Sequence, residues 1–259
     1  MARASSVCDD PVPSELVMTR GGPSPTSRSM LVESACLFVI EALQDVANPE
    51  KAEGMQAYMK TDMPFYGVQK PLRVPIARHL VAEFPPQTQA EYEELVLGLW
   101  GLPHREEKYL ALDVAGRHRG FVATASMPLY RRLIVEGAWW DFVDDVATNL
   151  IRSVVRAEPM AAWPEVDTWI NDDDMWLRRS AIICQVGAKG STDPTRLFAF
   201  CEARIDEKEF FIRKAIGWAL REYARTDPEA VAEFATSHRD RLSGLSYREA
   251  TKHIGHLIG

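Results

Sequence analysis

Two similar stretches in the second half of the chain decide the fold: Trp176-Leu-Arg-Arg-Ser-Ala-Ile182 and Phe211-Ile-Arg-Lys-Ala-Ile-Gly217. They share an order of aromatic, aliphatic, two basic and small or aliphatic residues, and they lie 35 positions apart. The pairs Asp193-Pro194 and Asp227-Pro228 recur at a spacing of 34, and each offers an N-cap acceptor followed by a proline suited to the first helical position. Trp139 precedes Trp176 by 37 positions. Such a period is typical of stacked helical hairpins that bury their apolar faces on their neighbours.

Helical periodicity extends over most of the chain from Met30 onward. Apolar residues with i, i+3, i+4 spacing form one stripe: Leu31, Ala35, Phe38, Val39, Ala42, Leu43 and Val46. Asn48-Pro49 is a further helix start, and residues 120–126 form either a short strand or a helix-connecting loop. We therefore predict an all-α fold, an α-solenoid of stacked HEAT-like hairpins with a concave basic cleft. This single domain spans residues 29–259 and follows a flexible extension, residues 1–28, that is rich in Ser, Pro and Gly.

The composition narrows the class of protein. With 259 residues, 46% hydrophobic and 26% charged, the chain has the composition of a soluble globular protein. No apolar run reaches the roughly 18 residues of a membrane span, and the N-terminus lacks a secretory signal pattern. The cysteines form no CxxC pair and fit reduced thiols: Cys8, Cys36, Cys184 and Cys201. We expect a cytoplasmic monomer with no membrane partner.

The charge is unevenly distributed along the chain. The net charge is −7, but residues 177–259 hold 14 Lys and Arg against 11 Asp and Glu. A basic surface needs only a local cluster, so an acidic total does not exclude a polyanionic partner. Random scatter explains the same counts equally well.

The segment Trp139-Trp-Asp-Phe-Val-Asp-Asp145 combines indoles with carboxylates. On a helix, Trp140 and Asp144 lie one turn apart on the same face. A buried, unpaired carboxylate is costly, so Asp144 is expected to be paired or exposed. The residues alone favour a simple interpretation, a half-buried tryptophan beside a solvated aspartate.

A cationic stripe is the second candidate site. Four residues spaced i, i+4, i+7 and i+11 share one helical face: Lys214, Trp218, Arg221 and Arg225. Three cations around a tryptophan suit a polyanion whose bases or sugars pack on the indole. Arg179, three residues after Trp176, adds a guanidinium fork suited to phosphate. The alternative is a solvated face with cation–π contacts, partly neutralised by Glu222.

Other chemical motifs are weak or missing. His253 and His256 share a predicted helix face, but no nearby ligand completes a three-ligand zinc site. The GxGxxG, GxxxxGK[ST] and GxSxG patterns of nucleotide-binding proteins and hydrolases do not occur. We expect no metal and no cofactor.

Taken together, these segments resemble the AlkD family of DNA alkylpurine glycosylases, which are all-helical and built from HEAT-like repeats. The resemblance covers most of residues 32–255 and runs in order through residues 48–60, 64–67, 139–144, 176–182, 211–228 and 245–253. It implies a functional cleft lined by Trp140, Asp144, Trp218 and Arg179, and a role for Tyr58 in holding DNA near the lesion. It also implies excision of cationic bases, such as 3-methyladenine and 7-methylguanine, from duplex DNA without a metal or cofactor.

The chemistry of these residues agrees with that activity. Hydrolysis of an N-glycosidic bond passes through an oxocarbenium-like sugar, for which glycosidases normally use two carboxyl groups. An alkylated purine is already cationic and leaves without protonation, so one carboxylate suffices. We predict that Asp144 stabilises charge at C1′ and positions water, while Trp140 and Trp218 pack around the deoxyribose. The cations expected on flanking phosphates are Arg179, Lys214, Arg221 and Arg225.

Two other functions stay open on the residues alone. One is a non-catalytic helical-repeat protein that binds DNA or RNA by shape and charge. The other is a scaffold that binds an acidic protein partner through the stripe around Trp218. Ordinary glycosylases flip the damaged base into a pocket, whereas the resemblance implies that the concave surface grips the backbone and the base need not enter one.

Overall fold

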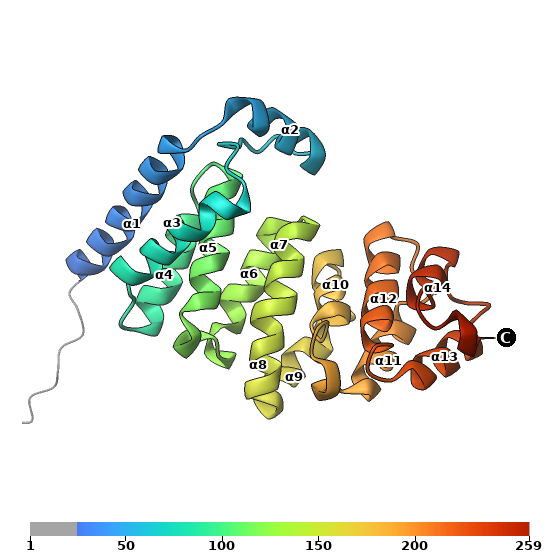
Figure 1. The fold of residues 1–259 in the computed structure, drawn as a ribbon. Coiled ribbons are helices and arrows are strands. Elements are labelled where there is room, and N and C mark those ends of the chain that lie inside the picture. Colours follow the sequence, from blue (N-terminus) through green and yellow to red (C-terminus); the bar gives the residue numbers. More distant parts are fainter. Residues whose placement is uncertain (1–24, 259) are drawn as a thin grey trace, which may run out of the picture.

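The computed structural model describes residues 25–258 and confirms the predicted fold class. Helices and short helical turns are the regular elements of this part of the chain, which holds no β-strand. They stack as an α-solenoid (Figure 1). Helix α1 begins at Pro25, four residues before the predicted start of the domain. The rest of the predicted extension, residues 1–24, lies outside the described residues.

The elements follow one another with short connections. The α-helices are α1 (Pro25–Asp45), α2 (Pro49–Met59), α3 (Lys70–Glu83), α4 (Gln89–Trp100), α5 (Arg105–Arg117), α6 (Met127–Gly137), α7 (Trp140–Asp145), α8 (Arg152–Ala157), α9 (Pro159–Trp169), α10 (Met175–Ile183), α11 (Pro194–Ala203), α12 (Phe210–Tyr223), α13 (Pro228–Ser237) and α14 (Gly244–Ala250). A π-helical segment, η3 (Val146–Ile151), joins α7 to α8 and makes them one continuous helix. The 3-10 segments are η1 (Arg119–Phe121), η2 (Thr124–Ser126), η4 (Lys189–Ser191) and η5 (Gly255–Leu257).

The helices form two rows. One row contains α5, α7 with α8, α10, α12 and α14, which stand side by side in Figure 1, and the other contains α4, α6, α9, α11 and α13. Helices α7, α10 and α12 begin at the same edge, because Trp139, Trp176 and Phe211 at their starts lie with ring centroids 4.9 to 6.3 Å apart. Arg105 at the start of α5 contacts Asp141 there as well. We call this the starting edge, and the sequence period corresponds to equivalent positions along it.

Side-chain caps confirm three predicted helix starts. Asn48, Asp193 and Asp227 each accept the backbone N–H three residues on, at 3.0, 3.1 and 3.0 Å. A proline follows each cap in α2, α11 and α13. Residues 120–126 form parts of η1 and η2 in the connection from α5 to α6, so they are a connecting loop and not a strand.

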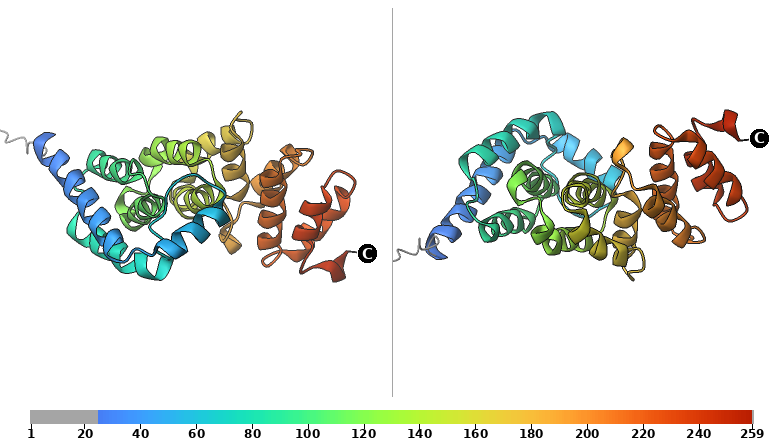
Figure 2. Two further views of the ribbon diagram at one scale, coloured as in Figure 1. Left: turned by 90° about the horizontal axis from the view of Figure 1, so that it is seen from above. Right: turned by 90° about the horizontal axis from the view of Figure 1, so that it is seen from below.

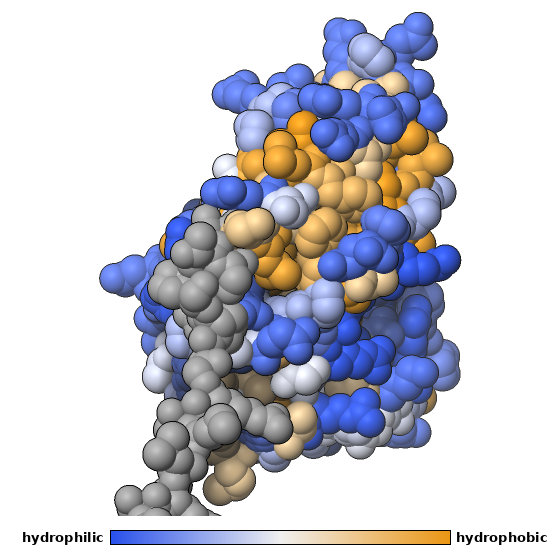
Figure 3. All heavy atoms as spheres, turned by 90° about the vertical axis from the view of Figure 1, so that its left-hand side faces the viewer, coloured by the Kyte–Doolittle hydropathy of each residue, from blue (hydrophilic) through white to orange (hydrophobic). Residues whose placement is uncertain are grey.

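Helix α1 forms the N-terminal end of the stack. Three residues of its predicted apolar stripe are fully buried: Ala35, Val39 and Leu43. Val46 lies just beyond the helix and is exposed, and the opposite face carries the exposed Met30 and Leu37. Figure 3 shows apolar side chains gathered on this end of the molecule. The outer face of α1 therefore mixes these apolar side chains with exposed polar ones, such as Glu33, Ser34 and Glu41.

Helix α2 projects from the stack. In Figure 1 it lies above the starting edge, and both views of Figure 2 place it beside the helix formed by α7 and α8. None of its residues is buried. Its place is therefore determined by its flanking segments and not by packing of the helix itself.

Two general features follow from the packing. No helix in residues 25–258 combines the length and apolar character needed to cross a bilayer. Cys36, Cys184 and Cys201 are free thiols, and burial raises the pKa of Cys184 to about 12. Cys8 lies outside the described residues.

Candidate active site

The continuous helix of α7, η3 and α8 carries the candidate site on its exposed face. Its opposite face is fully buried through Phe142, Val143, Val146 and Ala147. Asp141, Asp144 and Asp145 point away from these residues, because positions three and four apart share a helix face. Trp140 begins the helix and is half-buried against the core. The π-helical segment starts directly after Asp145, and such segments are frequently found at functional sites.

Arg179 of α10 holds the carboxylate of Asp144 with two hydrogen bonds. Arg179 Nε donates to Asp144 Oδ1 at 2.7 Å, and Nη2 donates to Oδ2 at 2.8 Å. The third nitrogen, Nη1, donates to the backbone oxygen of Phe211 at the start of α12, at 2.6 Å. One guanidinium therefore ties three consecutive helices of the row together and fixes the plane of the carboxylate.

The Asp144 carboxylate stays partly accessible. Its side chain is 17% exposed, against 6% for Arg179. Within the described part of the chain, Arg179 is the only side chain that hydrogen-bonds to this carboxylate. A carboxylate offers about four lone-pair positions, so two are left for water or a ligand. Burial raises the pKa of Asp144, and the hydrogen bonds and charge of Arg179 oppose that rise. A freely solvated aspartate, the simple interpretation of the sequence, does not fit these contacts.

A second arginine–aspartate pair lies on the other side of α7, and sequence reasoning missed it. Arg105 of α5 donates from Nη2 to Asp141 Oδ1 at 2.6 Å and from Nε to Oδ2 at 3.1 Å. The hydroxyl of Tyr109 donates to Asp141 Oδ2 at 2.5 Å. The side chains of Arg105 and Asp141 are 2% and 8% exposed. The available signal was the charged run of residues 105–107 at the start of an apolar helix, where all three side chains are buried.

Tyr58, predicted to contact DNA, lies on the projecting helix α2 and is 73% exposed. The loop after α2 is fixed by the buried Glu106, whose carboxylate accepts the backbone N–H groups of residues 66–68 at 2.9 to 3.0 Å. Gly67 has a φ of 81°, and a Cβ there would lie 1.9 Å from the backbone oxygen of Asn48. Glycine alone allows this approach. Glu106 and Gly67 together therefore determine where Tyr58 is presented.

Comparison with known proteins gives the family. A family model described as DNA alkylation repair enzyme matches residues 39–254, which is most of the chain. The chain belongs to the DNA alkylation repair enzyme family. It is similar to a solved structure, a predicted DNA alkylation repair enzyme from Enterococcus faecalis, with a TM-score of 0.74 and 28% sequence identity over 80% of this chain and 96% of that one. No curated protein matches the chain. The family predicted from the sequence blocks is confirmed.

In this DNA alkylation repair enzyme, the cationic stripe of α12 is paired with α14. Lys214 Nζ donates to Glu249 Oε1 at 2.9 Å, and Arg221 forms an ion pair with the other oxygen of Glu249. Gly217 permits the approach, because a Cβ there would lie 2.5 Å from the Cβ of Glu249. Trp218 lies between the two cations along the helix and is half-buried. The charges of Lys214 and Arg221 are therefore both partly neutralised within the protein.

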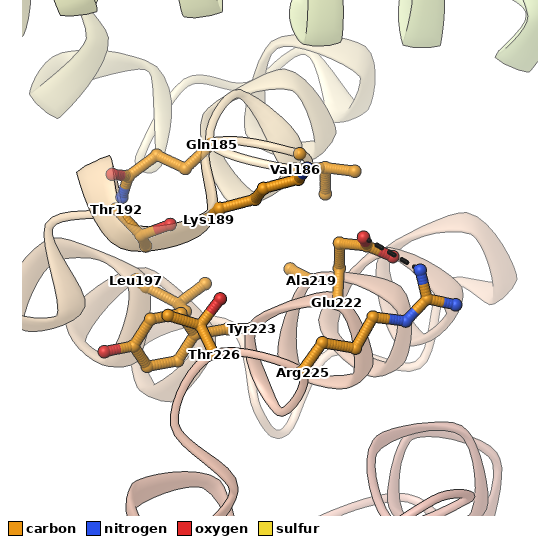
Figure 4. A pocket seen from close by; sticks show the side chains of 11 residues that line it. Gln185, Val186, Lys189, Thr192, Leu197, Ala219, Glu222, Tyr223, Arg225 and Thr226 are labelled. Atoms are coloured by element: carbon orange, nitrogen blue, oxygen red, sulfur yellow. Dashed lines mark hydrogen bonds and ion pairs between the residues drawn. The ribbon is translucent and has the colours of Figure 1, made fainter.

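The position of Arg225 differs from the predicted one on the stripe. Helix α12 ends at Tyr223, so helical spacing does not extend to Arg225. Its Nη1 donates to Glu222 Oε1 at 3.2 Å. Figure 4 shows this pair at a cavity of about 190 Å³, between the C-terminal ends of α10 and α12, which Gln185 also lines. The helix presents the other three predicted residues on one face, and Arg225 lies outside that group because the helix stops short of it.

Arg179 also differs from its predicted role on a phosphate. All three of its nitrogens donate within the protein, and the side chain has little exposed surface. The structure therefore makes Arg179 a group that positions Asp144.

His253 and His256 do not form part of a metal-binding site in the described structure. His253 and His256 are exposed and lie after the end of α14, so the predicted shared helix face does not form. Across residues 25–258 no group of three or more His, Cys, Asp or Glu side chains is arranged to hold a metal ion.

Proposed function

We propose that this DNA alkylation repair enzyme is a DNA glycosylase. It hydrolyses the N-glycosidic bond of cationic N3- and N7-alkylated purines, such as 3-methyladenine and 7-methylguanine, in duplex DNA. The observation that carries the proposal is the Asp144 carboxylate, which Arg179 fixes with two hydrogen bonds while part of it stays open to solvent. Membership of the family supports alkylated DNA as the substrate.

The charge of the leaving base determines how many carboxyl groups the reaction needs. A neutral leaving group requires an acid to protonate it and a second carboxylate at the sugar. An N3- or N7-alkylated purine departs as a neutral base once the bond breaks, so no acid is required. Asp144 then acts alone: it stabilises the positive charge that develops at C1′ and orients the attacking water through its free lone pairs.

The surrounding groups prepare Asp144 for this role. Arg179 holds the carboxylate plane before the substrate arrives, so no reorganisation is needed during bond cleavage. Trp140, one turn before Asp144, and Trp218 on α12 are the indoles that pack against the deoxyribose. An indole face favours a cationic sugar and excludes bulk water.

Contacts to the DNA backbone come from α12 and from α2. Lys214 and Arg221 contact phosphates in competition with Glu249, and the exposed Tyr58 approaches the duplex from α2. Arg225, which lies beyond α12, contacts the backbone farther from the damaged nucleotide. The enzyme works as a cytoplasmic monomer and grips the backbone without drawing the damaged base into a pocket.

Release of 7-methylguanine from methylated duplex DNA tests the proposal. We expect release by the wild type and a rate about 100- to 1,000-fold lower for Asp144→Asn, the usual cost of losing one electrostatic stabiliser of a transition state. Asp167→Asn is the matched control, because Arg196 holds Asp167 in the same two-bond manner, at 3.0 and 3.2 Å, on the other row of helices. It should release base at the wild-type rate.

The same assay separates the alternatives. Equal release by the wild type and Asp144→Asn would remove Asp144 from the chemistry. Salt-dependent DNA binding without any base release would identify a non-catalytic DNA-binding protein. Release of a neutral lesion such as hypoxanthine at a similar rate would contradict the single-carboxylate mechanism.

A further inference from the structure

A groove rich in arginine lies on the exposed face of the α7–α8 helix, on the side of α5. It has a volume of about 700 Å³, and four arginines line it: Arg117, Arg119, Arg152 and Arg156. We call it the arginine groove. Asp145 and Asn149 line it as well, nearer to the starting edge. Because Asp145 directly follows Asp144, the candidate active site and the arginine groove occupy two ends of one helix face.

Two of the four arginines have no hydrogen-bond or ion-pair partner within the part of the chain that the structure describes. Arg152 donates to the backbone oxygen of Val186 at 2.7 Å, and Arg117 lies 3.6 Å from Asp113. Arg119 and Arg156 are exposed, and neither forms an ion pair with any residue in the range 25–258. Burial and the nearby charge of Arg156 lower the pKa of Arg152. Four arginines against two carboxylates, Asp113 and Asp145, leave the lining of the groove with a net positive charge.

Stabilisation of helix ends does not account for the whole group. Arg117 and Arg156 lie in the last turns of α5 and α8, where a cation interacts favourably with the helix dipole. That effect needs one cation for each helix end. Arg119 lies outside α5, in η1, and its side chain is exposed, so it is not in the last turn of either α5 or α8.

The distance along the helix from Asp144 to Arg156 matches the separation of the two strands of a DNA duplex. Twelve residues separate Asp144 from Arg156, which corresponds to about 18 Å along a helix. This span is comparable to the width of a DNA duplex that lies across the row of helices. A duplex with one sugar at Asp144 therefore brings its other backbone to the arginine end of the same helix.

We infer that the arginine groove binds phosphates of the strand opposite the damaged one. The inference rests on the proposed function, because it takes the damaged strand to lie at Asp144. Exposed guanidinium groups suit this task, since they bind phosphate oxygens with paired N–H donors. Duplex DNA then contacts both ends of the α7–α8 helix, whereas a single strand contacts only one.

Fluorescence anisotropy with a labelled duplex and its labelled single strand tests this inference. For the Arg119→Ala/Arg156→Ala double variant, we expect duplex affinity to fall about tenfold at low salt, with a slope of log K against log salt that is smaller by about 1.8. Affinity for the single strand should fall by no more than about twofold, because a strand that is bound at Asp144 does not also extend to the groove. The matched control, Arg131→Ala/Arg132→Ala, removes the same charge from exposed positions on α6 and should bind both DNAs as the wild type does.

Each outcome of the anisotropy experiment either supports or overturns the inference about the arginine groove. Loss of duplex affinity alone supports the inference. Unchanged duplex binding, or an equal loss for the single strand, overturns it, and so does an equal loss in the control variant. Both arginines of the tested pair are exposed, so a thermal unfolding midpoint equal to the wild type verifies the fold. If the duplex effect is found but the wild type releases no 7-methylguanine, the glycosylase proposal fails while duplex binding by the groove stands.

Discussion

The two arginine–aspartate pairs that flank α7 use the same chemistry in two different ways. Arg105 and Asp141 close one side of the helix, and Arg179 and Asp144 close the other. Each pair has two short hydrogen bonds. The Asp141 pair has a third donor, Tyr109, and its side chains are 2% and 8% exposed. The Asp144 pair has no third donor from the described residues, and its carboxylate is 17% exposed.

The same motif therefore occurs in a closed form at Asp141 and in a partly open form at Asp144. A buried carboxylate that accepts three hydrogen bonds from protein donors is closed to a ligand and serves to hold helices together. A carboxylate that is held in the same geometry but left open can also meet a substrate. The deciding factor is therefore the missing donor at Asp144 and not the ion pair itself.

The strongest loss of stability is expected when the closed pair, Arg105 and Asp141, is broken. Asp141→Asn should lower the free energy of unfolding by about 3–5 kcal/mol, because it leaves the buried Arg105 guanidinium without its counter-ion. Asp144→Asn should cost less, about 1–3 kcal/mol, since water reaches that side of the pair. Urea denaturation of both variants measures the difference. A larger loss for Asp144→Asn would reverse the assignment of the structural and the open pair.

The next effect tests the geometry of the open pair. Arg179→Lys keeps the charge but cannot make two parallel hydrogen bonds to Asp144. We expect base release about 10- to 100-fold slower, equivalent to about 1.4–2.7 kcal/mol in the barrier. Arg196→Lys, in the matched pair with Asp167, should leave the rate unchanged. Wild-type activity for Arg179→Lys would show that charge alone suffices.

The pH dependence of base release tests the environment of the Asp144 carboxylate. Burial raises the pKa of Asp144 above its ordinary value of 3.8, and the carboxylate must be ionised to stabilise the sugar cation. As pH falls, Asp144 therefore takes up its proton earlier than an exposed aspartate would. The acid limb of the kcat/KM profile should lie above pH 3.8. A limb at or below that value would indicate a fully solvated carboxylate or a different catalytic group.

The smallest effect concerns the third paired carboxylate, Glu249, which acts through charge more than geometry. Glu249→Gln releases Lys214 and Arg221 for phosphate, so affinity for undamaged duplex should rise about threefold, with a steeper dependence on salt. Glu229→Gln, an exposed position on α13, removes the same charge elsewhere and is the control. Weaker binding by Glu249→Gln would show instead that Glu249 organises the two cations for DNA.

Much of the fold was predictable because it depends on local sequence patterns. The aspartate–proline and asparagine–proline starts, and the aromatic positions Trp139, Trp176 and Phe211, depend on residues close in sequence, and the structure confirms them. The end of α12 was not predicted, because no breaker separates Tyr223 from Arg225 in the sequence.

The site was predictable only in part. Trp140 and Asp144 share a helix face, which spacing reveals. The partner of each carboxylate could not be predicted from spacing, because Arg179 and Arg105 reach Asp144 and Asp141 from helices about 35 residues away. The pairing of Glu249 with the cationic stripe depends in the same way on the contact between α12 and α14 at Gly217. Such contacts are set by packing between hairpins.

The shared starting edge has an electrostatic consequence for the whole molecule. Each α-helix carries roughly half a positive charge at its N-terminus, and α5, α7, α10 and α12 direct theirs to the same side. Parallel macrodipoles reinforce one another locally, so they offset part of the negative charge on this side of a chain whose net charge is −7. These helix ends can therefore favour the approach of DNA at the starting edge, in addition to the positive charge of the arginine groove at the other end of the α7–α8 helix.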